Sequence, residues 1–155
     1  MGSRLPTSER EIKMYLKRRI EVNDPAALNR MGEKLYKTGN YRGAFKHYTK
    51  AAELGNMDAH CNLALLYREG EGIAKDEKKM LYHLEEAAID GNASSRYYLA
   101  GFEGRAGRYD RSNKHAIIAA SMKHDQSLEA LRQYIEMEPS AKRTLRELFV
   151  LTMLP

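Results

Sequence analysis

The sequence is short of the residues that hold small proteins together by covalent bonds or metal ions. It contains one cysteine, Cys61, no tryptophan and four prolines in 155 residues. A single cysteine cannot form an internal disulfide, and it excludes a zinc site built from several cysteines. Few prolines, together with many Ala, Leu, Glu, Lys and Arg residues, favour helices over strands. We therefore expect an all-α protein that is stabilised by side-chain packing.

Long hydrophobic runs are also missing. None approaches the roughly 20 apolar residues that a membrane-spanning helix needs. Residues 1–20 are too charged to contain the apolar core of a secretory signal. We therefore expect an intracellular protein, cytoplasmic or nuclear, that does not contact a membrane.

Familiar catalytic motifs are absent as well. There is no H-E-x-x-H string, no phosphate-binding loop and no G-x-S-x-G turn. His60 and Cys61 form a candidate nucleophile pair, but neighbours in sequence do not face each other on a helix. Gly70 and Gly72 fit a turn with permissive backbone angles better than a phosphate site. We expect no catalytic residue, no cofactor and no metal; a small hydrolase using His60 or Cys61 ranks third among the possible functions.

The net charge of +5 is unevenly distributed along the chain. Residues 25–91 carry ten basic and ten acidic side chains, so the excess of positive charge lies towards the two ends. A nucleic-acid-binding array is expected to concentrate positive charge on its binding face. The distribution here favours an ordinary solvated surface.

A repeated unit is the strongest feature that is present. Equivalent positions recur after 32 or 36 residues, in the series Met31, Leu63, Leu99 and in the series Ala51, Ala87, Ala119. Four extra residues in the turn around Gly70–Ile73 of the middle unit reconcile the two intervals, and such an insertion in a turn costs little. A period of about 34 residues predicts an array of helix pairs. A small residue at Gly32 lets the two helices of the first pair approach closely.

The repeat predicts how the chain is organised. Ser8 and Glu11 have the spacing of a capping box, and Asp24-Pro25 is a strong helix start. The expected segments are a loose lead-in (1–7), a capping helix (8–22), three repeats over 24–124 (24–55, 56–91 and 92–124), and a degenerate fourth helix pair (125–155) that closes the array. The third repeat is the least regular, since Glu103 stands where the second repeat has the aromatic Tyr67.

These residues resemble two related repeat families. The first unit resembles the tetratricopeptide repeat signature at Leu28, Met31, Gly32, Leu35, Ala44, Tyr48 and Ala51. The middle unit is more similar to the Sel-one-like repeat, at Ala59, Leu63, Ala64, Tyr67, Gly70, Gly72, Ile73, Asp76, Lys79, Ala87, Ala88 and Gly91. The resemblance covers residues 25–124. It implies an adaptor or scaffold that assembles protein complexes and is not itself a catalyst.

Two departures from these families limit what the resemblance implies. His47, His83 and His115 share one equivalent position, where the Sel-one-like pattern often has tryptophan. Equivalent helices lie about 10 Å apart, which is too far for all three to share one metal ion easily, so we expect a packing role. The tetratricopeptide clamp for a C-terminal carboxylate is not expected either, because its positions are occupied by Asn29, Glu33, Ser94 and Tyr98.

The resemblance places the binding surface on the inner face, made by the first helix of each repeat. The candidate partner-binding residues are Asn29, Glu33, Tyr36, Lys37, Cys61, Leu65, Arg68 and Tyr97, with Gly101 beside the last. Tyr, Arg and an exposed Leu are common anchors for a peptide or helix.

The sequence thus predicts an all-α, right-handed α-solenoid of antiparallel helix pairs with about nine helices. The predicted function is a monomeric protein-binding scaffold whose concave groove holds a peptide or helix of another protein. The alternative is an RNA-binding helical array of the pentatricopeptide kind, which has a similar period and would bind single strands with a steep salt dependence.

Overall fold

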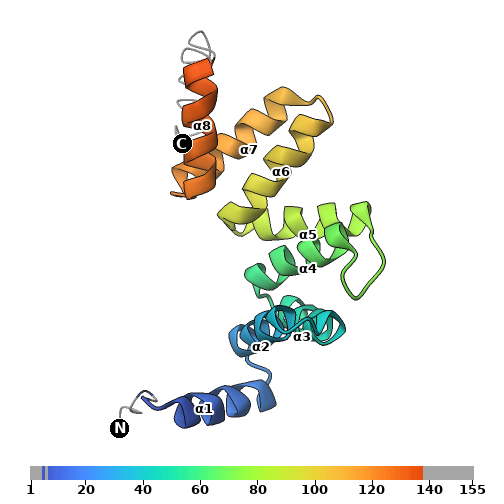
Figure 1. Ribbon diagram of the computed structural model, residues 1–155, viewed down its shortest axis with the longest axis vertical. Coiled ribbons are helices and arrows are strands. Elements are labelled where there is room, and N and C mark those ends of the chain that lie inside the picture. The colour runs from blue at the N-terminus through green and yellow to red at the C-terminus, as the bar shows by residue number, and fades with distance from the viewer. Residues whose placement is uncertain (1–4, 6, 138–155) are drawn as a thin grey trace. The chain divides into compact units, whose positions relative to one another are not determined.

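A computed structural model describes residues 5 and 7–137, and this part of the chain contains eight α-helices and no strand (Figure 1). The helices are α1 (Glu9–Glu21), α2 (Pro25–Lys37), α3 (Tyr41–Glu53), α4 (Met57–Glu69), α5 (Glu77–Ile89), α6 (Ala93–Arg105), α7 (Tyr109–Ser121) and α8 (Asp125–Met137). The all-α prediction is confirmed. The last amphipathic helix predicted from the sequence, around residues 141–151, lies outside the described residues.

Most of the helices begin at a side chain that caps the first turn. The capping oxygen accepts a hydrogen bond from a backbone N–H three residues later, in helices that start after Ser8, Asp24, Asn40, Asn56, Asp76 and Asn92. The capping box of Ser8 and Glu11 and the helix start at Asp24-Pro25 are both confirmed. Helix α7 is different, because Arg108 stands at its N-cap and makes no side-chain cap.

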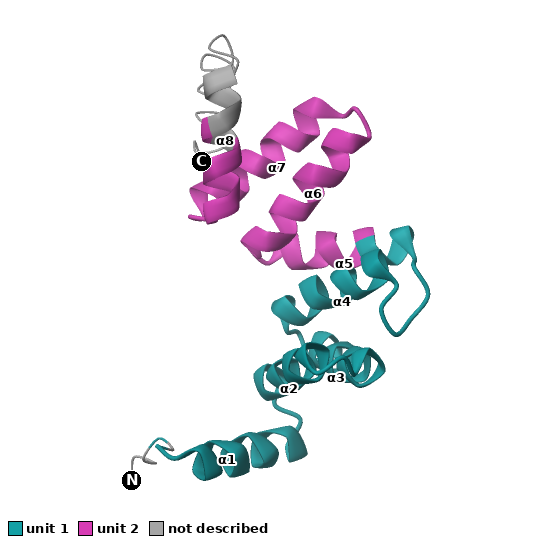
Figure 2. Cartoon of the chain, in the orientation of Figure 1, with its two compact units in different colours: residues 1–80 teal, residues 81–155 magenta. Residues whose placement is uncertain are grey.

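The chain divides into two compact units, residues 1–80 and residues 81–155, with the boundary inside α5 (Figure 2). In unit 1, α1 packs against α2, α2 against α3, and α3 against α4. In unit 2, α6 packs against α7, and α7 against α8. The repeat boundaries proposed from the sequence stay predictions.

The core of unit 1 combines small and large side chains. Its buried members are Leu28, Ala44, Tyr48, Ala51, Ala52, Ala59, Leu63 and Leu66. Gly32 is buried in α2, and a Cβ atom added there would overlap the ring of Tyr48. Glycine therefore sets the distance between α2 and α3, as the sequence predicted. Burial raises the pKa of the Tyr48 phenol, and the nearby charge of Glu33 acts in the same direction.

The four-residue insertion between α4 and α5 packs back onto α2 and α3. We call residues 70–73 the glycine loop. Gly72 has a φ of +73°, and a Cβ there would lie 2.7 Å from the Cβ of Tyr41 and 2.8 Å from the backbone nitrogen of Arg42. Ile73 packs against the core of unit 1. The insertion is therefore a packed part of unit 1.

In unit 2, a buried carboxylate takes the place of an aromatic ring. Glu103 on α6 is buried, and its side chain forms ion pairs with Arg108 and with Arg111, the latter at 3.2 Å. The Ser112 hydroxyl of α7 also donates a hydrogen bond to the Ala100 carbonyl of α6, at 2.8 Å. Polar contacts thus hold α6 and α7 together at the position where the second repeat has Tyr67. One of them engages Arg108, the residue that stands at the N-cap of α7 in place of Asn or Asp.

Candidate protein-binding site

Most of the predicted partner-binding residues lie on two helices of unit 1. We call this surface the α2–α4 face, comprising Asn29, Glu33, Tyr36 and Lys37 of α2 and Cys61, Leu65 and Arg68 of α4. On α2 these positions recur after three or four residues, so they share one side of the helix. That side differs from the one that carries Leu28, Gly32 and Leu35 towards α3.

Hydrogen bonds between amide side chains join α2 to α4. The Asn62 side-chain nitrogen donates to the side-chain oxygen of Asn29 at 3.0 Å, and the Asn29 nitrogen donates to Glu33 at 3.0 Å. Asn29 is only 5% exposed, and Cys61 is only 6% exposed. These two predicted contact residues therefore offer a partner little surface. Asn29 orients Glu33 and joins the two helices, whereas a direct contact of either residue with a partner stays a prediction.

Tyr36 is held in place at the end of the α2–α4 face by the glycine loop. The Glu71 carboxylate raises the pKa of Tyr36 to about 12, mainly by accepting a hydrogen bond from its phenol. The negative charge of Glu71 is also the main cause that raises the pKa of Tyr41. The two rings meet edge to face, with 5.2 Å between their centroids. The Tyr36 ring is thus packed on Tyr41 and its phenol stays protonated at neutral pH, while the residue remains 36% exposed.

The exposed part of the α2–α4 face carries charges of both signs. Glu33, Lys37 and Arg68 are exposed, and Leu65 is half-buried. The Nε of Arg68 pairs with Glu69 at 2.6 Å. Because carboxylates and cations alternate here, a nucleic-acid backbone would meet repulsion as well as attraction. A peptide with mixed charge and an apolar or aromatic anchor suits this surface better.

The last predicted residue, Tyr97, lies on α6 in unit 2, whereas the other seven lie in unit 1. It is half-buried on α6, where its ring lies 5.6 Å from that of Tyr98 and 5.1 Å from that of His124. Its neighbour on the predicted surface, Gly101, is exposed on the same helix. Tyr97 thus packs within unit 2, and its contact with a partner stays a prediction.

The three equivalent histidines have different surroundings. His47 Nδ1 donates to the Gly43 carbonyl at 2.9 Å, and the ring of His83 packs edge to face on Tyr82 with centroids 5.0 Å apart. His115 lies 3.5 Å from Arg96, and burial, then this arginine, lower its pKa. Over the residues that the structure describes, no three His, Cys, Asp or Glu side chains lie together as metal ligands would.

Sequence reasoning missed two residues that shape the α2–α4 face, Asn62 and Glu71. Asn62 directly follows the predicted contact residue Cys61, and its amide is the natural partner for a buried Asn29. Glu71 could have been recognised from the sequence, because it is the one charged residue among the four inserted residues. A loop that contains a carboxylate between two glycines can fold back to accept hydrogen bonds from neighbouring phenols.

Comparison with solved structures defines the class of fold. A Sel1 repeat protein from Oxalobacter formigenes superimposes with a TM-score of 0.67 at 21% identity, covering 79% of this chain and 98% of its own. A protective antigen present in uropathogenic Escherichia coli strains, which displays an SLR (Sel1-like repeat) fold, gives a TM-score of 0.72 at 21% identity. That match covers 92% of this chain, but only 33% of the antigen. The fold is thus an α-helical repeat array of the SLR class, as the sequence predicted.

A family profile matches part of the sequence. The Sel1 repeat profile matches residues 25–56 and 58–92, in line with the resemblance seen in the first two units. No curated protein has a matching sequence. Sel1 repeats form helical scaffolds that generally bind other proteins and typically lack a catalytic role. None of the described helices combines the length and the hydropathy that crossing a membrane requires.

Proposed function

We propose that this chain is a non-catalytic adaptor that binds a peptide or helix of another protein on its α2–α4 face. The observation that carries the proposal is the edge-to-face packing of Tyr36 on Tyr41, the residue that Gly72 of the glycine loop closely approaches. An aromatic side chain that is fixed before binding loses little conformational entropy when a partner packs on it. Tyr36 therefore serves as the main anchor.

The neighbouring groups support a short protein segment as the ligand. Leu65 offers apolar surface, and Arg68 offers a planar cation, so with Tyr36 the face presents three types of side chain suited to interface centres. Glu33 and Lys37 lie on the same side of α2 and supply a polar rim. The mixed charge of this rim argues against the RNA-binding alternative, because single-strand binders line their grooves with cations and stacking aromatics.

The test compares two doubly substituted chains in quantitative affinity purification. Tyr36→Ala with Arg68→Ala removes both anchors, whereas Tyr109→Ala with Arg105→Ala removes the same residue types from exposed positions of unit 2. We expect the first variant to lose at least about tenfold of the captured partner and the second to retain it. The interaction is then measured with the purified partner, and circular dichroism checks that both variants are folded.

Equal capture by the two variants would refute the α2–α4 face as the binding site. Retarded migration of a single-stranded RNA at low salt, abolished by the Tyr36 and Arg68 substitutions, would favour the RNA-binding alternative instead.

A further inference from the structure

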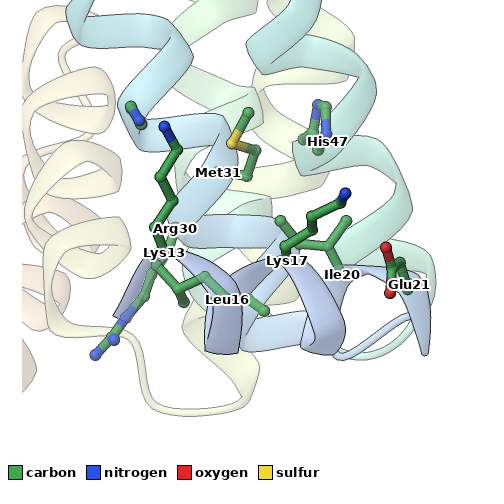
Figure 3. A pocket seen from close by; sticks show the side chains of 10 residues that line it. Lys13, Leu16, Lys17, Ile20, Glu21, Arg30, Met31 and His47 are labelled. Carbon is green, nitrogen blue, oxygen red and sulfur yellow. The ribbon is translucent and has the colours of Figure 1, made fainter. Parts of the chain in front are cut away.

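A second candidate surface of unit 1 is a groove of 430 Å³ between α1, α2 and α3 (Figure 3). We call it the α1–α2 groove. Its apolar floor is made by Leu16 and Ile20 of α1 and by Ala27 and Met31 of α2, and His47 of α3 also lines it. Figure 3 shows Leu16 and Ile20 on α1 and Met31 on the neighbouring helix α2.

The groove exists because α1 packs loosely on the rest of unit 1. The apolar residues of α1 follow a helical spacing, which predicts a stripe that covers the end of the array. In the structure α1 has no buried residue, and Ile12 and Tyr15 stay 43% and 42% exposed. Leu16 and Ile20 are half-buried, so part of the stripe lines an open groove.

The rim of the groove is strongly basic. Lys13 and Lys17 lie on the α1 side, and Arg30 and Lys34 lie on the α2 side, each pair separated by one helical turn. All four are exposed, and within residues 5 and 7–137 none of them pairs with a carboxylate. Glu21 is the single acidic side chain of the lining. The groove therefore has one row of cations on the α1 side and one on the α2 side of its apolar floor.

We propose that the α1–α2 groove binds an acidic amphipathic helix of a partner protein. The apolar stripe of the partner helix, with a period of three or four residues, fills the floor of the groove. Glu or Asp residues of the partner helix, on both sides of that stripe, pair with the two basic rows. Carboxylates four residues apart on the ligand match the spacing of Lys13 and Lys17 and that of Arg30 and Lys34.

Other ligands match these features less well. A fatty acid would fill the floor, but its single carboxylate needs only one of the four cations. A nucleic acid would use the cations, but the lining contains no Tyr, Phe or Trp ring on which a base could stack. The proposal goes beyond the proposed function, because Arg30, Met31 and Lys34 face a different side of α2 from Glu33 and Tyr36.

The probe is a synthetic, fluorescein-labelled peptide of about 14 residues, or four helical turns. It has leucines at helical spacing on one face and glutamates on both flanks, and a second peptide carries lysine in place of every glutamate. Fluorescence anisotropy with the full chain measures the dissociation constants. We expect the glutamate peptide to bind at least about tenfold more tightly than the lysine peptide at low salt, and this preference to weaken as salt rises.

Two matched variants test the site. Lys13→Glu with Lys17→Glu reverses one basic row, whereas Lys46→Glu with Lys50→Glu reverses two exposed lysines of the same spacing on α3, outside the groove. The first variant is expected to bind the glutamate peptide about tenfold more weakly and to gain affinity for the lysine peptide. The α3 variant should stay within about twofold of the parent chain. Gain of lysine-peptide binding cannot result from unfolding.

Results of three kinds would overturn the proposal. One is equal loss of binding in the two lysine variants, or binding of both peptides to the parent chain with equal affinity. Another is full displacement of the bound peptide by palmitate or by an oligouridylate at lower concentration than unlabelled peptide. The third is concentration-dependent dimerisation in sedimentation that is lost with Lys13→Glu and Lys17→Glu, since a second copy would then fill the groove. The Tyr36→Ala/Arg68→Ala variant should bind the glutamate peptide normally, so this test fails or succeeds independently of the proposed function.

Discussion

At the scale of single residues, the contact between Gly32 and Tyr48 decides how closely α2 and α3 approach. Tyr48 is only 3% exposed, so its ring is enclosed by other residues. A glycine inside a helix normally costs about 1 kcal/mol relative to alanine. It is retained here because any Cβ would overlap the ring. Helix propensity therefore yields to packing at this position.

Gly32→Ala should lower the free energy of unfolding by about 1 to 3 kcal/mol, because overpacking of a filled core outweighs the gain in helix propensity. Gly101→Ala is the matched control. Gly101 is an exposed residue inside α6, where an added Cβ would approach Arg105 Nη1 at an ordinary 3.5 Å. This substitution should stabilise the chain by up to about 1 kcal/mol. Urea denaturation measures both, and stabilisation by Gly32→Ala would contradict the close approach.

At the scale of helices and loops, the glycine loop shows how an insertion becomes part of the packing. Gly72 allows the backbone to contact Tyr41 and Arg42 at the start of α3, and Ile73 adds apolar contact with the core. Glu71 then lies near enough to Tyr36 to raise the pKa of its phenol. One short loop thus joins α4 to both helices of the preceding pair.

Gly72→Ala should destabilise unit 1 more than Gly39→Ala does. Both glycines have positive φ, +73° and +77°, so each substitution costs about 1 to 2 kcal/mol in backbone strain. A Cβ at Gly39 has nothing within 4 Å, whereas one at Gly72 meets the backbone of α3. We expect an additional loss of about 1 to 3 kcal/mol for Gly72→Ala. Equal losses of unfolding free energy in urea would show that the loop is not packed.

Local signals in the sequence predicted the helices well. Asx caps, glycine stops and the repeat of small residues depend on neighbours within one turn or one helix pair, so they can be recognised without coordinates. The same signals could not show that Asn29 and Cys61 are buried. Aligning equivalent positions of the repeats shows on which side of a helix a residue lies, but not how closely the next helix packs against that side. They also could not show where the glycine loop packs, or that Leu16 and Ile20 line a groove. Those features depend on contacts between segments that are distant in sequence.

At the scale of the whole chain, the division into two compact units affects how stability is distributed. In helical-repeat proteins each repeat contacts mainly its neighbours, so stability is close to a sum of local terms. The apolar core described for residues 1–80 and the polar contacts of Glu103 and Ser112 within residues 81–155 are separate sets of interactions. A defect in one set is therefore expected to act mostly within its own unit.

Hydrogen–deuterium exchange of the Gly32→Ala variant should show this difference. Amides of α2 and α3 are expected to exchange about 5- to 160-fold faster than in the parent chain, in line with a local loss of about 1 to 3 kcal/mol. Amides of α6 and α7 should change by less than about twofold. An equal increase in all four helices would show that the described chain opens as one cooperative unit.

The fit between the glycine loop and the repeat before it bears on how such arrays can be rebuilt. In the second repeat the equivalents of Tyr36 and Tyr41 are Arg68 and Glu77, and neither carries a phenol that could donate a hydrogen bond to a following carboxylate. The inserted loop is thus complementary to one neighbour alone. The repeats of this chain are consequently not interchangeable. Shuffling or duplicating them would separate the glycine loop from the tyrosines that it packs against. The side chains therefore specify the order of the repeats along the chain.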